Sequence, residues 1–330
     1  MSDRKSYIDI GKGIAIIGIM LMHYENGVFP VTLNRWVGCF MIALFYFVSG
    51  YLSSAKELDS WKNWFGKRRR QLVMPYIWFS LVIILFDCIL FAFELMPGKI
   101  VLRDIYKTFT LRGIGTLWFL PAIFFGEAVA RCFIRGELWK KSLILALSVI
   151  YSGLYYKWDA NYGNLNEMYR IIDAPFRTLS NIAGAWWIIV SGYMIGKYFK
   201  QEIENASLRV RLAITVFVLG AYTSMICGIG SRGVLLYVMG SLGIIMLSTI
   251  ISHLPTAKIW EYFGRNSLIV MATHYSIIQV GCELINKHYT GNSQLGGVSA
   301  LYWFAGSLVL EIPVIWLINR HLPFLIGKKR

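Results

Sequence analysis

The segment that decides the fold runs from Lys12 to His23 and reads KGIAIIGIMLMH. A cation stands at one end of this apolar run and an imidazole at the other. At about 1.5 Å of rise per residue, a helix would separate the two side chains by about 16 Å, or about half the hydrocarbon core of a bilayer. The lysine is therefore expected at a membrane surface and the histidine near mid-membrane, where a titratable group is costly and usually functional.

The composition of the whole chain also requires a membrane. Of its 330 residues, 56% are hydrophobic and 15% are charged, and the mean hydropathy is +0.54. One soluble exterior cannot cover so much apolar surface, so the predicted fold class is all-α, a polytopic integral membrane protein. Apolar runs of about 20 residues follow one another without a linker, which predicts a single membrane domain over residues 1–330.

About ten transmembrane helices are predicted from these runs and the polar breaks between them. With both termini in the cytoplasm, most Lys and Arg residues fall on that side, as the positive-inside rule favours. This bias accounts for much of the net charge of +15 and gives no reason to expect a nucleic-acid partner. The predicted helices are 11–29, 36–55, 73–95, 115–134, 142–156, 177–199, 210–228, 233–252, 266–287 and 299–319.

Two external segments carry most of the remaining basic residues. One contains Lys99, Arg103, Lys107 and Arg112, and the other is the polar loop 157–174 with the residues beside it. A basic external face would suit an anionic substrate, although ordinary solvated loops have the same composition. The loop also mixes aromatic side chains with acids and amides, a combination that suits sugar recognition and equally an interfacial aromatic belt.

Three ionisable residues are predicted at one depth in the membrane. His274 lies about ten residues into a helix entered from the cytoplasm, and Glu311 lies about a dozen residues into the last helix, entered from outside. Both match the depth of His23, and together they are a stronger functional signal than any one of them. Each also has an alternative role as a packing residue.

A buried histidine paired with a carboxylate is a standard means of taking a proton from a hydroxyl. The carboxylate partner of His23 must come from another helix, because an acid two positions away on the same helix faces elsewhere. Glu311 and Glu127 are the candidates, followed by Asp87 and Glu94, and the sequence does not choose among them.

Several short motifs, in this order along nearly the whole chain, resemble the acyltransferase-3 family of bacterial membrane acyltransferases, which includes the O-antigen and exopolysaccharide O-acetyltransferases. They are the first-helix histidine after a basic residue, the FYFVSGYL segment at 45–52, the basic cluster before Pro75-Tyr76, the LWFL segment at 117–120, the Gly264-x-Asn266-Ser267-Leu268 segment leading to His274, and Glu311-Ile-Pro313.

The resemblance implies a multi-pass protein of the bacterial cytoplasmic membrane that moves an acyl group, such as acetyl, from cytoplasmic acyl-CoA to a hydroxyl of a cell-surface or lipid-linked glycan. His23 falls at the position of the catalytic histidine, and Lys12 replaces the family's arginine. A lysine offers only a point charge to the CoA phosphates, whereas guanidinium groups offer a fork. The predicted sites are catalytic (His23, Glu311, His274, Glu127), cofactor-binding (Lys12, Arg68, Arg69, Arg70) and substrate-binding (Trp118, Ser49, Arg232).

The residues leave two questions open. A transporter or flippase for a glycan or lipid-linked sugar is the alternative function, with the buried histidines and acids relaying protons. Within the acyltransferase hypothesis, direct transfer and a covalent acyl-histidine intermediate fit equally well. The five cysteines are scattered singly with no metal-binding spacing, so no metal is expected.

Overall fold

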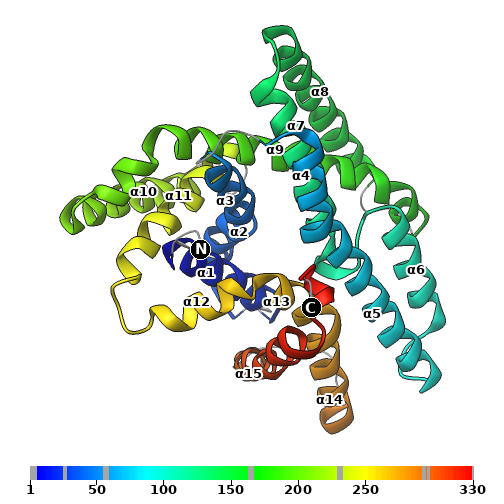
Figure 1. Cartoon of the computed structure of the whole chain (residues 1–330). Coiled ribbons are helices and arrows are strands. Elements are labelled where there is room, and N and C mark those ends of the chain that lie inside the picture. Colours follow the sequence, from blue (N-terminus) through cyan, green and yellow to red (C-terminus); the bar gives the residue numbers. More distant parts are fainter. Residues whose placement is uncertain are drawn as a thin grey trace. The chain divides into compact units, whose positions relative to one another are not determined.

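The computed structural model describes residues 6–24, 28–54, 59–162, 167–228, 233–291, 295 and 298–328, and these residues are almost entirely helical, with no strand among them (Figure 1). The α-helices are α1 (Ser6–Tyr24), α2 (Val31–Met41), α3 (Ala43–Ser53), α4 (Trp61–Arg68), α5 (Met74–Ala92), α6 (Gly98–Phe109), α7 (Phe119–Arg135), α8 (Leu138–Tyr162), α9 (Glu167–Asn205), α10 (Leu208–Gly228), α11 (Val234–Ile251), α12 (Ala257–Arg265), α13 (Ser267–Thr273), α14 (Val280–Thr290) and α15 (Val298–His321). Shorter turns are the π-helices η1 (Arg69–Val73) and η3 (His274–Gln279) and the 3-10 helices η2 (Gly115–Trp118) and η4 (Pro323–Ile326).

The fold class predicted from the sequence is confirmed. In the described ranges, nine helical stretches are long and apolar enough to cross a membrane. The predicted helix 142–156 also forms, as the middle of α8, but α8 is not among these nine. Its apolar part, between Lys141 and Lys157, is shorter than the roughly 20 residues that a span needs.

Several helices extend beyond their predicted ends. The first begins at Ser6 rather than at residue 11, and the basic cluster at 67–70 is helical because α4 already starts after Ser60, whose hydroxyl caps it by accepting from the Asn63 amide at 3.3 Å. The predicted loop 157–174 is largely helical as well, apart from residues 163–166, which lie outside the described ranges. Polar residues with good helix propensity continue these helices past the apolar runs.

The chain divides into two compact units. The first contains Met1–Leu58 and Ser191–Arg320, and the second contains Asp59–Val190 and His321–Arg330. Helix α9 therefore contributes its first part to the second unit and its last part to the first. The single domain predicted over residues 1–330 stays a prediction.

In the first unit, α1 packs against α12 (Figure 1). At two points of this contact there is no room for a side chain. A Cβ at Gly13 would lie 2.7 Å from the carbonyl carbon of Trp260, and one at Gly264 would lie 2.7 Å from that of Asp9. Residue numbers rise along α1 as they fall along α12, so the two helices run antiparallel. Glycine is required at both contacts because the opposing atoms are backbone atoms.

The same segment returns to α1 at its other end. Helix α12 ends at Arg265, and the side-chain amide of the next residue, Asn266, donates to the Tyr262 carbonyl at 2.8 Å. Helix α13 and η3 then continue the chain to Gln279. The Gln279 side chain donates to the His23 carbonyl at 3.3 Å. The segment 257–279 therefore contacts both ends of α1 and fixes the positions of Gly13 and His23 relative to this segment.

In the second unit, α7 separates two polar clusters. Near its C-terminal end, Arg131 donates to the Asp59 carbonyl, and its guanidinium lies 5.4 Å from the centre of the Trp64 ring. Its N-terminal end follows a tight turn in which the Gly113 amide donates to the Lys107 carbonyl at 3.0 Å. The two clusters lie at opposite ends of one apolar helix, as two membrane faces require.

Candidate active site

His23 is the penultimate residue of α1 and is half-buried. Its ring centre lies 4.5 Å from that of Tyr275 and 5.2 Å from that of His274. The following residue, Tyr24, is buried and packs beside Cys282 and other apolar side chains, which fixes this end of α1. The two histidines predicted at one depth are therefore neighbours in space.

His274 is completely buried, at the start of the π-helix η3. Its Nδ1 lies 2.6 Å from the Val270 carbonyl oxygen, which can only accept a hydrogen bond, so Nδ1 carries the proton of the neutral ring. Nε2 then presents a lone pair, and in the described ranges it has no hydrogen-bond partner. A buried basic nitrogen without a partner is uncommon, and π-helical turns are frequent at functional sites.

Glu311 is also completely buried, on α15. Its two carboxyl oxygens lie 2.9 and 3.0 Å from the Thr273 hydroxyl, which also lies 2.9 Å from the Ile269 carbonyl. Thr273 immediately precedes His274, so Glu311 is attached to the segment that carries the second histidine. In the described part of the chain, no hydrogen bond joins Glu311 directly to His23.

Lys12, at the other end of α1, is paired with an acid one turn away. Its ammonium lies 2.8 Å from Asp9, whose side chain is 3% exposed. The Arg265 guanidinium lies 3.7 Å from the same carboxylate and also pairs with Glu261. The predicted phosphate-binding lysine is thus one of two cations that surround a buried carboxylate.

The remaining predicted cations and Glu127 belong to the second unit. Arg68 lies 2.6 Å from the Glu127 carboxylate, which also accepts from the Trp64 indole at 3.2 Å. Arg69 and Arg70 are exposed on η1. Glu127 therefore has a cationic partner within its own unit, and two arginines of the cluster face outward.

The two further candidate carboxyl groups have different surroundings. Asp87 is buried on α5, within hydrogen-bonding reach of Asp104 on α6, which Arg103 contacts at 2.8 Å. Glu94 is exposed in the turn after α5, with a φ of 58°.

The three predicted substrate-binding residues lie apart in the sequence and in different settings. Ser49 lies on α3 between Phe47 and Tyr51, whose backbones leave no room for side chains at Gly192 and Gly196 of α9, so this part of α3 is a close helix contact. Trp118 is half-buried at the end of η2 in the second unit. Arg232 lies outside the described residues.

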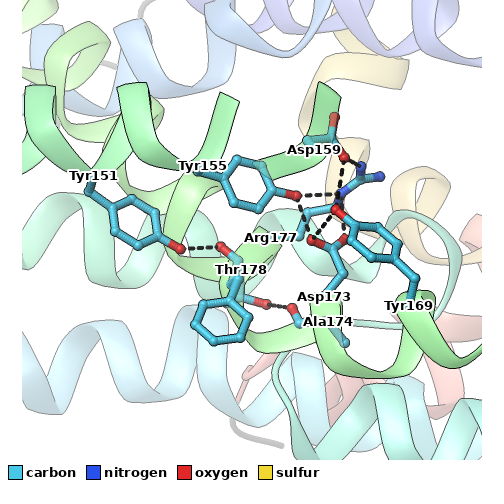
Figure 2. A network of polar contacts seen from close by, with 9 residues as sticks. Tyr151, Tyr155, Asp159, Tyr169, Asp173, Ala174, Arg177 and Thr178 are labelled. Carbon is cyan, nitrogen blue, oxygen red and sulfur yellow. Dashed lines mark hydrogen bonds and ion pairs between the residues drawn. The ribbon is translucent and has the colours of Figure 1, made fainter. Parts of the chain in front are cut away.

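Sequence reasoning missed Tyr275 and a polar network in the second unit that Figure 2 shows. The network joins Tyr155 and Asp159 of α8 to Asp173 and Arg177 of α9. The acids and Arg177 are visible in the sequence, and Asp173 pairs with Arg177 along one helix, but the contacts of Tyr155 and Asp159 with α9 depend on an antiparallel hairpin of helices where a loop was predicted. Nothing in the sequence marked Tyr275 as a neighbour of His23, since tyrosine is common in membrane helices.

No group of three or more His, Cys, Asp or Glu side chains in the described ranges is placed to hold a metal ion.

A family model described as an acyltransferase domain matches residues 5–320, nearly the whole chain. No curated protein matches the chain, and no solved structure does.

Proposed function

The chain belongs to the acyltransferase-3 family and is a membrane acyltransferase, and we propose that it moves an acyl group, in the first place acetyl, from acyl-CoA to a hydroxyl of a cell-surface or lipid-linked glycan. The proposed base is His23. Donor and acceptor approach from opposite faces of the bacterial cytoplasmic membrane, with both termini of the chain in the cytoplasm, as the positive-inside distribution of Lys and Arg favours.

The observation that carries this proposal is the His23 ring centre 5.2 Å from that of His274, whose Nε2 has no hydrogen-bond partner among the described residues. A ring that takes a proton inside a membrane needs a neighbour to receive its second N–H. The Nδ1 hydrogen bond to Val270 fixes the tautomer of His274, so that Nε2 can only accept. His274 thus fills the orienting position that a carboxylate occupies in a Ser-His-Asp triad.

The reaction then needs two proton transfers at one ring. The acceptor O–H bond breaks as its proton passes to His23, while the oxygen attacks the thioester carbonyl carbon. The carbon–sulfur bond breaks, and the leaving thiolate of CoA takes the proton back from the His23 imidazolium. The products are an ester and free CoA thiol, and His23 returns to its starting state.

Glu311 and Thr273 serve as positioning residues in this scheme. Their hydrogen bond attaches α15 to the residue before His274. The Glu311 carboxyl group therefore holds the segment that carries His274 in place and takes no part in the proton transfer. Glu127 has the corresponding structural role in the second unit, where it holds Arg68 beside Trp64.

The donor is held by cations on the cytoplasmic side. Arg69 and Arg70 are the proposed phosphate ligands, because they are exposed and guanidinium forks match phosphate geometry. In the first unit, Lys12 is proposed by itself as a point charge for the donor, and Asp9 partly neutralises it. The proposed acyl path runs along α1 from this lysine to His23.

Membranes containing the protein and radiolabelled acetyl-CoA test the proposal. The wild type should label a cell-surface glycan, and His23→Ala should abolish labelling. His253→Ala is the matched control, since that histidine is exposed after α11, and it should label normally. Labelling that survives His23→Ala would refute the catalytic role, and a glycan that is made but fails to reach the surface without the protein would favour transport instead.

A further inference from the structure

Gln279 joins the end of α1 to Glu283 of α14. Its amide nitrogen lies 3.3 Å from the His23 carbonyl oxygen and 2.9 Å from a carboxylate oxygen of Glu283. Both of these oxygens can only accept hydrogen bonds, so the nitrogen donates both of its hydrogens and the orientation of the amide is fixed. The Gln279 side chain therefore holds the Glu283 carboxylate next to the backbone of the proposed base.

Glu283 has no counter-cation. It is half-buried, and in the described ranges its only hydrogen bond is the one from Gln279 and it forms no ion pair. Lys287, one turn later on α14, is exposed and does not pair with it in those ranges. The Glu283 charge also acts on the hydroxyl of Tyr24, the residue after His23. The second carboxylate oxygen therefore remains available to accept hydrogen bonds from a ligand.

The side-chain oxygen of Gln279 has no donor either. Oε1 is buried and lacks a hydrogen-bond partner among the described residues. The amide cannot turn to satisfy this oxygen without losing its two N–H contacts to His23 and Glu283. Unsatisfied buried polar atoms are uncommon, and exceptions are expected chiefly at functional sites.

Tyr275 lies on the same segment and beside the ring of His23. Tyr275, Gln279 and Glu283 follow one another at intervals of four residues, about one helical turn, along η3 and α14. The Tyr275 ring centre lies 4.5 Å from that of His23, and 37% of the tyrosine is exposed. An exposed aromatic ring suits the apolar side of a sugar ring, and a carboxylate suits its hydroxyl groups.

We propose that Glu283, positioned by Gln279, binds hydroxyl groups of the acceptor next to the one that is acylated, and that the acceptor unit at this subsite is an uncharged sugar. This assignment rests on the proposed function, which supplies a glycan acceptor and His23 as the base, and it adds the charge class of that glycan.

The charge of the subsite favours an uncharged sugar. Sugar hydroxyls can donate to the Glu283 carboxylate in charge-assisted hydrogen bonds, which are stronger than those to a neutral oxygen. A uronic acid or a sugar phosphate would bring a second negative charge to a half-buried carboxylate that no cation pairs with in the described ranges. An acidic sugar is therefore expected to bind more weakly than the neutral sugar of the same configuration.

Sugar binding to the full-length protein in detergent tests this subsite without acyl transfer. The probes are oligomers of glucose, galactose and mannose and the oligomers of equal length built from the corresponding uronic acids, measured by calorimetry at one fixed salt concentration. The wild type should bind at least one neutral oligomer, and more tightly than its acidic counterpart.

Glu283→Gln should change the two affinities in opposite directions. This substitution keeps an oxygen that accepts from Gln279 but removes the charge, so it should weaken binding of the neutral oligomer about tenfold. It should strengthen binding of the acidic oligomer, because the repulsion is removed. Misfolding cannot produce such opposite changes. Glu94→Gln, which removes an exposed carboxylate in the turn after α5, is the matched control and should change either affinity by less than about threefold.

The role of Gln279 is tested by a double-variant cycle. Gln279→Leu releases the Glu283 carboxylate and should also weaken binding of the neutral oligomer. Because Gln279 acts through Glu283, the double variant Gln279→Leu with Glu283→Gln should bind about as weakly as Glu283→Gln alone. Losses that add in full would contradict the positioning role.

Three results would overturn the subsite: a wild type that binds none of the neutral oligomers, a wild type that binds the acidic oligomers as tightly, or a Glu283→Gln protein with wild-type affinities. His23→Ala keeps the backbone carbonyl that accepts from Gln279, so it should bind the neutral oligomer normally while losing acetyl transfer. Acetyl transfer that survives His23→Ala would refute the catalytic proposal alone, so the two failures are distinguishable.

Discussion

Replacing Gly264 by alanine tests whether the contact between α1 and α12 places His23, the proposed catalytic base. The added methyl group would lie 2.7 Å from the Asp9 carbonyl carbon and 2.8 Å from the Gly13 nitrogen. Carbon atoms in contact prefer about 3.5–4.0 Å, so the helices must separate by about 1 Å. Neither opposing atom belongs to a rotatable side chain, so the cost should lie at or above the upper end of the roughly 1–3 kcal/mol typical of overpacking.

The displacement should also reach the other end of α1. The segment 257–279 contacts both Asp9 and His23, and a misplacement of about 1 Å at a reacting group can cost about 100-fold in rate. Gly264→Ala should therefore lower both the apparent unfolding temperature in detergent and the rate of acetyl transfer. Gly220→Ala, on α10 with open space around it, is the matched control and should be neutral or slightly stabilising. Wild-type stability and rate in Gly264→Ala would refute the argument.

Three further substitutions address the buried polar groups. His274→Phe keeps the ring volume but removes the Nε2 acceptor, so kcat should fall about 100-fold or more with little change in KM, and His274→Gln should retain more activity. Thr273→Val removes the only donor described for Glu311 and should destabilise the protein by about 1–3 kcal/mol in thermal unfolding, whereas the double variant with Glu311→Gln should not lose the sum of the two single effects. Arg68→Met removes the cation paired with the Glu127 carboxylate, so it should lower the unfolding temperature more than the double variant with Glu127→Gln does. An equal loss in the two variants would contradict a stabilising ion pair.

The proximity of the two catalytic candidates was predictable in part. Apolar run lengths and the alternation of helix direction predicted His23, His274 and Glu311 at one depth, and the structure places His23 beside His274 and attaches Glu311 to Thr273. Depth follows from counting residues along a helix, which uses only local information. The direction in which each ring points depends on the π-helical turn at His274 and on the crossing of α1 by that segment, and neither leaves a periodic pattern.

Ion pairs, too, divide into those that local sequence can predict and those that depend on tertiary packing. The Lys12–Asp9 pair was readable in principle, because residues three apart face one another on a helix, but it requires α1 to begin at Ser6 rather than at residue 11. The Arg68–Glu127 pair and the Arg177–Asp159 pair join residues on different helices. Such contacts depend on tertiary packing. The composition of the segment 157–174 alone fits a solvated loop as well as it fits a pair of helices.

The partner of a membrane-buried base need not be a carboxylate. A charged acid beside His23 would require its own desolvation in the apolar interior, and two ionised groups there recover that cost only with ideal geometry. A neutral imidazole acceptor costs less to bury, yet it can still receive the N–H of a protonated ring. His274 meets this requirement because its Nδ1 is committed to the Val270 carbonyl, whereas Glu311 is held by Thr273. In the proposed mechanism Glu311 therefore positions helices, and the proton transfer is assigned to the pair of histidines.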